Sequence, residues 1–239
     1  MLEMATNSKI FNLNEVISEA KDLKNKKFNT KSIAFNIFLC VISTLLSQFG
    51  VACYYGCGLG TDPISVFVDG LHGSCGLTYG QISTICYVIL GVLLIIFDRK
   101  YFGISTAIGI FFGGGLLDYC VALIANAFPI ETISLFTKVC ILITGLLTTG
   151  VGYGLGIACN LGVGTFQFVP IFFNDYLHME LKYAQILSDA IFFVIGWILG
   201  GVVGIGTVVG VVLTGYILDW AIKLVQKPLD KVGPMLIEK

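Results

Sequence analysis

Four polar side chains recur at helical spacing in a short, glycine-rich segment of the sequence. Asp62, Ser65, Asp69 and His72 are separated by three, four and three residues, which places them on one face of a helix predicted over residues 62–72. Carboxylate, hydroxyl and imidazole groups on one face can bind a polar solute or a cation in a water-filled cavity. The alternative is a helix at the membrane interface with this face in water.

The composition requires a membrane around these residues. Of 239 residues, 56% are hydrophobic and only 12% are charged, and the mean hydropathy is +0.90. Soluble domains carry about 25% charged residues, and apolar runs of about 20 residues are long enough to cross a bilayer. The sequence therefore predicts an integral membrane protein. The net charge of −1 gives no indication of a nucleic-acid partner.

The sequence repeats itself once. The stretch that starts at Phe102 aligns without a gap with the stretch that starts at Val203, and several glycine, threonine and aspartate positions coincide. The chain is therefore interpreted as two homologous membrane repeats, residues 33–125 and 133–225, joined by an external linker, residues 126–132.

Each repeat is predicted to contain a long apolar helix, a glycine-rich break with a short helix, and two further helices. The short helices are expected at 62–72 and 165–177, and the others at 33–55, 80–97, 104–124, 134–158, 183–199 and 205–225. At 1.5 Å per residue, a helix of ~11 residues covers about half of a ~30 Å hydrocarbon core, which favours a re-entrant half-helix. Each repeat then crosses the membrane three times, and this odd number inverts the second repeat relative to the first. The expected fold class is all-α: a polytopic membrane protein of two inverted repeats, each with three transmembrane helices and a re-entrant half-helix.

The basic residues orient this arrangement. Six of the fourteen lysines and arginines lie in the N-terminal segment, residues 1–32, which also carries an amphipathic helix suited to the interface or to a partner. Arg99, Lys100 and the tail, residues 226–239, fall on the same side, whereas the linker around Glu131 has no lysine or arginine. Because basic residues favour the cytoplasmic side, both termini are expected to be cytoplasmic. Four crossings per repeat would instead place Arg99 outside.

Charged residues inside the predicted spans extend the set of candidates. Asp118 and Asp219 occupy matched positions in the final helices of the two repeats, and Lys138 is the only basic residue well inside a predicted span. We expect the two aspartates either to couple transport to a cation or proton, with Lys138 as counter-charge, or to cap neighbouring helices. For Lys138 and Asp189, which lie near helix ends, the alternative is snorkelling to the headgroups.

The candidate binding residues also include glutamines, because the repeat aligns Gln167 with Ser65 and Gln185 with Gln81. The full set is Asp62, Ser65, Asp69, Gln81, Asp118, Lys138, Gln167, Gln185, Asp189 and Asp219. No His-Glu-x-x-His motif and no serine–histidine–aspartate set is apparent, and most of the eight cysteines fall in apolar helices, where cysteine behaves as a small hydrophobe. We therefore expect no enzyme activity, no metal site and no cofactor.

The two halves resemble the YitT/YczE-type family of bacterial integral membrane proteins. The resemblance rests on "LGTDPISVFVDGL", "GLTYG" and "DRKYFGIST" in the first half and on "GWILGGVVGIGT" and "ILDW" in the second, and it covers about residues 45–225. It implies a multi-pass protein of the bacterial inner membrane, in a family often described as permeases. Ile64 and Ser65 stand where some relatives place tryptophan and aspartate.

Two classes of function follow from these observations. The inverted repeat favours a permease for a small polar or ionic solute, because alternating access uses two pseudo-symmetric halves. The alternative is a non-transporting capture or scaffold subunit of a membrane complex. The expected partners are the lipid bilayer, a small polar solute or cation, and either a second copy of the chain or another membrane subunit.

Overall fold

The computed structural model describes residues 30–159, 161–179 and 181–208, together with residues 210, 213, 217, 220 and 224. This part of the chain is helical and contains no strand, which confirms the all-α prediction. The predicted N-terminal amphipathic helix, Asp219 and the C-terminal tail lie outside the described residues.

The helices follow the predicted boundaries to within a few residues. They are α2 (Thr30–Cys57), α3 (Pro63–Cys75), α4 (Tyr79–Asp98), the 3₁₀ turn η1 (Arg99–Tyr101), α5 (Ile104–Ile108), the π-helical segment η2 (Gly109–Gly113), α6 (Gly114–Ala127), α7 (Leu135–Ala158), α8 (Phe168–Leu177) and α9 (Leu181–Ile198). The sequence predicted one continuous helix where α5, η2 and α6 lie. Both ends of η2 are glycines, whose lack of a Cβ permits the wider π-helical turn.

Local capping signals explain where α3 and α4 begin. Asp62 is the N-cap of α3 and Pro63 is its first residue, so the fixed φ of proline suits the helix start. Thr78 accepts a hydrogen bond from the backbone N–H of Gln81, and the Gln81 side chain accepts one from the backbone N–H of Thr78, which forms a capping box for α4. Gly76 ends α3 with φ 68°.

Four described helices are long and apolar enough to cross a membrane: Ala34–Cys57, Tyr79–Tyr101, Ile104–Ala127 and Leu135–Ile157. A shorter apolar helix covers Tyr183–Ile198. Large apolar side chains cover their outer surfaces; Phe111 is 79% exposed and Ile198 is 75% exposed. Contiguous apolar surface of this kind is rare on soluble monomers and suits contact with lipid.

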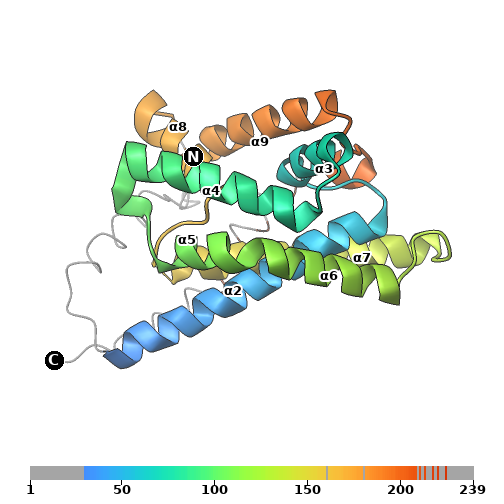
Figure 1. Cartoon of the computed structure of the whole chain (residues 1–239), viewed down its shortest axis with the longest axis horizontal. Coiled ribbons are helices and arrows are strands. Elements are labelled where there is room, and N and C mark those ends of the chain that lie inside the picture. The colour runs from blue at the N-terminus through green and yellow to red at the C-terminus, as the bar shows by residue number, and fades with distance from the viewer. Residues whose placement is uncertain are drawn as a thin grey trace, which may run out of the picture.

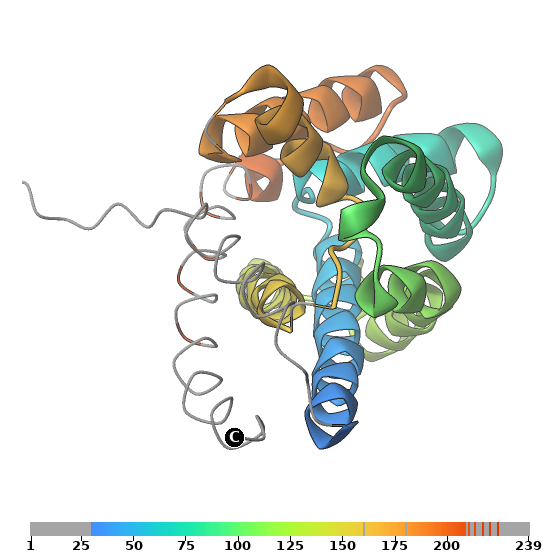
Figure 2. The same ribbon diagram turned by 90° about the vertical axis from the view of Figure 1, so that its left-hand side faces the viewer.

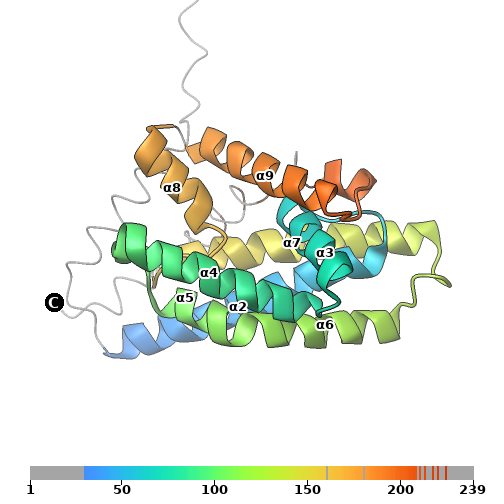
Figure 3. The same ribbon diagram turned by 45° about the horizontal axis from the view of Figure 1, so that its top comes forward.

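The long helices run side by side, and the two short ones lie at opposite ends of the bundle. Figures 1 and 3 show α4, α6, α7 and α9 in roughly parallel array, with α2 crossing them obliquely. In both views α3 lies near the end where α6 is joined to α7, and α8 lies near the end where α4 is joined to α5. Seen end-on in Figure 2, α2 lies between α6 and α7.

Two clusters of buried side chains hold the bundle together. The first joins α2, α6 and α7 and includes Tyr54, Leu117 and Leu146. The second joins α3, α4 and α9 and includes Val68, Ile82 and Phe192, with Phe166 from the segment before α8. The short helices are therefore packed into the protein core.

Backbone hydrogen bonds link the two glycine-rich breaks to distant loops in a reciprocal way. The carbonyl oxygen of Leu59 accepts from the N–H of Gly206 at 2.8 Å, and that of Leu161 accepts from the N–H of Ser105 at 3.0 Å. We call residues 59–60 with 204–207 the first joint, and residues 161–163 with 103–106 the second joint. In each joint, the break in one half of the chain contacts the start of the last predicted helix of the other half.

Glycine is required at the centre of both joints. Gly60 has φ 100° and Gly162 has φ 107°, a region that side chains other than glycine rarely adopt. A Cβ at Gly60 would lie 2.6 Å from the backbone nitrogen of Gly204, and a Cβ at Gly162 would lie 2.7 Å from that of Gly103. The backbones thus approach as closely as glycine allows.

The contacts between α2 and α7 are also reciprocal, because a glycine of each helix packs against the backbone of the other. A Cβ at Gly152 would lie 2.6 Å from the nitrogen of Ser47, and a Cβ at Gly50 would lie 2.6 Å from the nitrogen of Thr149. The same number of residues separates Ser47 from Thr149 and Gly50 from Gly152. The hydroxyl of Ser43 also donates to the carbonyl oxygen of Gly152 at 2.8 Å. Small residues therefore bring the two helices into close contact.

Candidate functional site

The break before α3 places a carboxylate inside the protein. Asp62 is 7% exposed and Ser65 is 3% exposed. The Ser65 hydroxyl donates a hydrogen bond to Asp62 Oδ1. A Cβ at Gly210, at the start of the last helix, would lie 3.5 Å from the Asp62 Cα. The structure therefore brings two of the predicted residues together, as their spacing of three indicated.

Four tyrosines from three helices lie within electrostatic range of Asp62. They are Tyr54 and Tyr55 from α2, Tyr87 from α4 and Tyr153 from α7. The Tyr55 hydroxyl also donates to the carbonyl oxygen of Ser65 at 3.3 Å. We define the Asp62 cluster as Asp62, Ser65, Tyr54, Tyr55, Tyr87, Tyr153 and Asp189.

Asp189 is the second carboxylate of this cluster. It lies on α9 and interacts electrostatically with Asp62. Gln185, one turn earlier, donates from Nε2 to Asp189 Oδ1 at 2.9 Å. Two more predicted residues are thus adjacent to each other, and one of them lies within electrostatic range of Asp62.

The Asp62 cluster has no basic counter-charge in the described part of the chain. The ion pairs found there join Lys100 to Asp98 and to Asp175, at the loop after α4. A carboxylate removed from water is costly unless it is paired or neutralised by a proton. Asp62 and Asp189 therefore form an electronegative site that a cation or a proton would stabilise.

Two buried hydroxyl groups have no hydrogen-bond partner among the described residues. They belong to Thr61 and Ser188, which are 4% and 1% exposed. Thr61 directly precedes Asp62, and Ser188 directly precedes Asp189. Buried hydroxyls are normally satisfied by protein, water or a ligand. Because these hydroxyls are neighbours of Asp62 and Asp189 in the chain, the Asp62 cluster could offer hydrogen bonds to a polar ligand.

Tyr87 connects the Asp62 cluster to the start of the other short helix. Its hydroxyl accepts from Gln48 Nε2 at 3.0 Å, and its ring centroid is 5.3 Å from that of Phe166. Gly113 of the π-helical segment packs here, because a Cβ at that position would lie 3.0 Å from the Tyr87 ring. Next to Phe166, Gln167 Oε1 accepts from the N–H of Gly164 at 3.2 Å. The beginnings of α3 and α8 thus approach the same tyrosine.

The outer half of the predicted polar face contacts protein groups instead. Asp69 accepts from the Tyr79 hydroxyl at 3.1 Å and from the N–H of Val202 at 2.6 Å. His72 contacts the carbonyl oxygen of Leu77 through Nδ1, and its ring centroid is 4.2 Å from that of Tyr79. These contacts tie α3 to α4 and to the loop after α9. Asp69 therefore has a structural role in joining helices, which distinguishes it from Asp62.

Asp118 and Gln81 both bind the start of α4. Asp118 Oδ2 accepts from the Thr78 hydroxyl at 2.6 Å, and Asp118 Oδ1 accepts from the N–H of Gly80 at 2.7 Å. Gln81 completes the capping box with Thr78. This is the capping arrangement that the sequence offered as an alternative to ion coupling.

Lys138 is in the first turns of α7 and lies within electrostatic range of Cys57 at the end of α2. Its partner in the predicted coupling, Asp219, lies outside the described residues. The coupling of these residues to a cation or proton stays a prediction.

Sequence reasoning missed the four tyrosines of the Asp62 cluster. A signal was present, because Tyr54 and Tyr55 directly precede the glycine break, and Tyr87 and Tyr153 lie well inside apolar helices. Membrane tyrosines are enriched near the interfaces, so tyrosines far from helix ends are informative.

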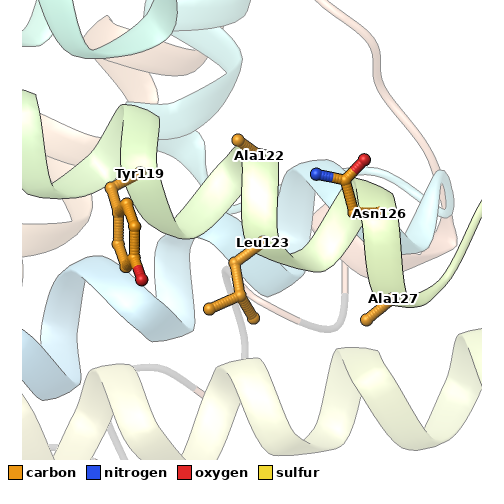
Figure 4. A pocket seen from close by; sticks show the side chains of 5 residues that line it. All are labelled: Tyr119, Ala122, Leu123, Asn126 and Ala127. Atoms are coloured by element: carbon orange, nitrogen blue, oxygen red, sulfur yellow. The ribbon is translucent and has the colours of Figure 1, made fainter.

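An open groove on α6 is separate from the Asp62 cluster. Tyr119, Ala122, Leu123, Asn126 and Ala127 line it, and its volume is about 480 Å³. Figure 4 shows that all five side chains come from the last turns of α6. None of them is charged, so the groove lacks the features of an ion site.

The apolar helices and their lipid-suited surface define a helical membrane protein with several candidate spans. The chain belongs to the DUF6198 family, a family of unknown function, whose model matches residues 31–223.

Three relatives are similar over most of their length. YyaS of Bacillus subtilis is 26% identical over 189 residues, which cover 78% of this chain and 92% of YyaS. The membrane protein YczE of Bacillus subtilis is 24% identical over 184 residues, 74% of this chain and 81% of YczE. A protein of Haemophilus influenzae is 23% identical over 171 residues, 71% of this chain and 75% of that protein. The YczE part of the predicted resemblance is confirmed, and kinship with YitT stays a prediction. No solved structure matches this chain.

Proposed function

We propose that the protein is a permease for a small polar or ionic solute, which binds at the Asp62 cluster. The observation that supports this most directly is the buried Asp62 carboxylate, which lies at a helix break without a basic partner among the described residues. Broken helices at membrane depth are tolerated where they line a site, and they form the binding sites of many transporters.

We further propose that the chain consists of two inverted repeats in the bacterial inner membrane, with three crossings each and both termini in the cytoplasm. The reciprocal hydrogen bonds of the two joints support this arrangement. So do the matched contacts of α2 with α7, and the positions of α3 and α8 at opposite ends of the bundle in Figures 1 and 3. Half-helices that enter from opposite membrane faces would bring their first turns together near Tyr87.

This arrangement suggests how solute would pass. In alternating access, one repeat rocks against the other around a fixed central site. The joints are short contacts between repeats, made by backbone groups and glycines, and they lie next to Asp62 and Gln167 in the chain. Small rotations at the joints would therefore open the Asp62 cluster to one side or to the other.

The test is uptake into proteoliposomes that contain the purified full chain. A panel of labelled solutes should include cations, anions, amino acids and neutral polyols. We expect saturable uptake of at least one solute. Replacing Asp62 with Asn should lower it about tenfold or more, since loss of a charged partner costs ~1.5–3 kcal/mol. Glu131→Gln, which removes an exposed carboxylate in the linker, is the matched control and should leave uptake unchanged.

Absence of uptake for the whole panel, with correctly folded protein, would contradict the permease. The alternative of a non-transporting capture or scaffold subunit would then be favoured. Equal loss in Asp62→Asn and Glu131→Gln would show that the Asp62 cluster has no special part in uptake.

A further inference from the structure

We infer that Asp69 and Asp175 form two gates, one at each membrane face, which close the proposed binding site by tying each short helix to the opposite half of the chain. This inference rests on the proposed function, because it names the residues that would admit solute to that site. We define the Asp69 gate as Asp69, Tyr79 and Val202, and the Asp175 gate as Asp175, Lys100 and Tyr101.

The Asp175 gate joins α8 in the second half of the chain to the end of α4 in the first half. Asp175 Oδ2 lies 3.2 Å from Lys100 Nζ and accepts a hydrogen bond from the Tyr101 hydroxyl at 3.0 Å. One residue later, the Tyr176 hydroxyl donates to the carbonyl oxygen of Phe97 at 3.3 Å. All three contacts cross from one half of the chain to the other.

The Asp69 gate joins α3 in the first half to the loop after α9 in the second half. Asp69 Oδ2 accepts from the N–H of Val202 at 2.6 Å, and Asp69 Oδ1 accepts from the Tyr79 hydroxyl at 3.1 Å. The Ser74 hydroxyl of α3 also donates to the carbonyl oxygen of Leu199 at 3.5 Å. The contacts with Val202 and Leu199 again cross between the halves.

The partners of the two aspartates occupy matched positions in the repeat. Extending the gapless alignment of the two last predicted helices by one residue pairs Tyr101 with Val202. Tyr101 binds Asp175 through its hydroxyl, and Val202 binds Asp69 through its backbone N–H. Each aspartate therefore contacts the same position of the opposite half, two residues before a joint.

The neighbouring hydroxyl contacts are matched as well. Continuing the alignment of the two short helices pairs Ser74 with Tyr176. Ser74 donates to Leu199, directly after α9, and Tyr176 donates to Phe97, in the last turn of α4. The two gates are therefore the same set of contacts, made once in each direction between the halves.

The gates lie at opposite membrane faces. Tyr79 and Tyr101 are the first and last residues of one candidate span. At 1.5 Å per residue, the helix between them is about 33 Å long, close to the thickness of the hydrocarbon core. Figures 1 and 3 also show α3 and α8 near opposite ends of the bundle. A solute that crosses the protein would therefore pass both gates in turn.

Each gate aspartate lies beyond the buried start of its short helix. The first residue of α3 and of α8 is buried, and the last residue of each is exposed. Asp69 lies in the middle of α3 and Asp175 near the end of α8, whereas Asp62 and Gln167 lie at the helix starts. Movement of the outer part of a short helix away from the opposite half would thus uncover its inner end.

The contacts of the gates can open without leaving a charge unpaired. The side chains of Lys100 and Asp175 are 46% and 32% exposed, so water screens their ion pair, and exposed pairs of this kind are weak. Lys100 keeps a second partner, Asp98, in its own half. Asp69 likewise keeps Tyr79 when the contact with Val202 breaks. Alternating access requires contacts of this type, which close one face while the other opens.

The test measures from which side of the membrane the buried site can be reached. In the full chain, Ser65→Cys provides a reporter at a position that is 3% exposed, and Cys75→Ser and Cys140→Ser remove the exposed native thiols. Modification by a charged, membrane-impermeant methanethiosulfonate is timed in right-side-out and inside-out membrane vesicles. The chain without the reporter gives the background from buried cysteines. Thr61→Cys is the second reporter if Ser65→Cys fails to fold.

Removing a gate aspartate should open one side only. In Asp175→Ala, we expect modification at least threefold faster from the side proposed as cytoplasmic and within twofold of the parent from outside. Asp69→Ala should give the opposite pattern. If either alanine variant fails to fold, Asp175→Asn and Asp69→Asn keep the side-chain size and weaken the contacts, with the same side preference expected.

Two controls separate gating from loss of stability. Glu131→Ala removes an exposed carboxylate from the linker and should leave both rates within twofold. Asp118→Ala removes a carboxylate whose contacts with Thr78 and Gly80 lie within the first half of the chain. Any increase in Asp118→Ala should be equal from the two sides, because no contact between the halves is lost.

Equal acceleration from both sides in Asp175→Ala or Asp69→Ala would overturn the gates, and so would unchanged rates. A one-sided increase in Asp118→Ala would also overturn them. If Asp175→Ala opened the outside and Asp69→Ala the inside, the gates would stand and the proposed orientation would be reversed.

Comparison with uptake separates the gates from the permease. Solute uptake into proteoliposomes together with modification that is independent of side would overturn the gates and leave the permease standing. One-sided opening in a chain that takes up no solute would keep the gates and contradict the permease.

Discussion

Asp118 of α6 accepts a 2.6 Å hydrogen bond from the hydroxyl of Thr78, the residue that caps α4. A second hydrogen bond from the N–H of Gly80 holds the same carboxylate over the first turn of α4. Negative charge at this position is stabilised by the unpaired N–H groups of a helix start. The contact joins two candidate spans through a polar group.

This contact predicts a structural role for Asp118. Replacing it with Ala should destabilise the protein by about 1–2 kcal/mol, as for loss of a helix cap, and Asn should cost less. Thermal unfolding of the detergent-solubilised protein, followed by retention on size exclusion, would measure this. The pH and ion dependence of any uptake should be unchanged in Asp118→Asn. An altered dependence in a stable variant would instead support the coupling role.

The joints predict paired sensitivity to substitution. Gly60→Ala and Gly162→Ala should each destabilise the protein by about 1–2 kcal/mol or more, because each adds a Cβ at positive φ. Each added Cβ would also be too close to backbone of the opposite joint partner. Gly73→Ala is the control, since a Cβ there meets nothing within 4 Å. Unfolding temperatures of the three variants in one detergent would decide this. If only one of the two joint variants had a lowered unfolding temperature, the two joints would not be equivalent.

The crossing of α2 and α7 predicts a steric limit on Gly152. Leucine at this position would push against the backbone of Ser47 and separate the two helices, so we expect a loss of at least ~2 kcal/mol or failure to fold. Gly115→Leu is matched in chemistry, but a Cβ at Gly115 meets nothing within 4 Å and the residue is exposed on α6. Yields of monodisperse protein from parallel preparations would compare the two. Similar yields would contradict close packing at the crossing.

The proposed topology predicts which positions are reached from each side of the membrane. In a cysteine-free background, a cysteine at position 99 and a tag at Lys239 should be labelled only after the cell is permeabilised. A cysteine at position 131 should be labelled in intact cells by an impermeant maleimide. Labelling of Lys239 from outside would contradict cytoplasmic termini, and labelling of position 99 from outside would favour four crossings per repeat.

Helix positions could be predicted because the signals are local. Hydropathy marks the apolar runs, and Thr78, Pro63 and Gly76 mark helix ends within a turn of themselves. The Asp62–Ser65 contact could also be predicted, since a spacing of three brings side chains together on any helix. These features depend on neighbours in the sequence alone.

Other features depend on contacts between distant segments. Nothing near Asp69 in the sequence indicates that Tyr79 and the N–H of Val202 would satisfy its carboxylate. Tyr87 and Tyr153 are conspicuous inside apolar helices, but nothing in the sequence indicates that both come within electrostatic range of Asp62. The α5–η2–α6 segment reads as one helix because a π-helical turn leaves the hydrophobic pattern almost intact.

The two joints also constrain how this sequence can evolve. Each glycine-rich break packs against backbone of the other half of the chain. Gly60 is in close contact with Gly204, and Gly162 is in close contact with Gly103. A change on one side must be matched by a change on the other, and such positions are expected to co-vary. Homologues can therefore diverge freely on their lipid-facing surfaces, while the halves remain mutually dependent and inherit substitutions at the joints in pairs.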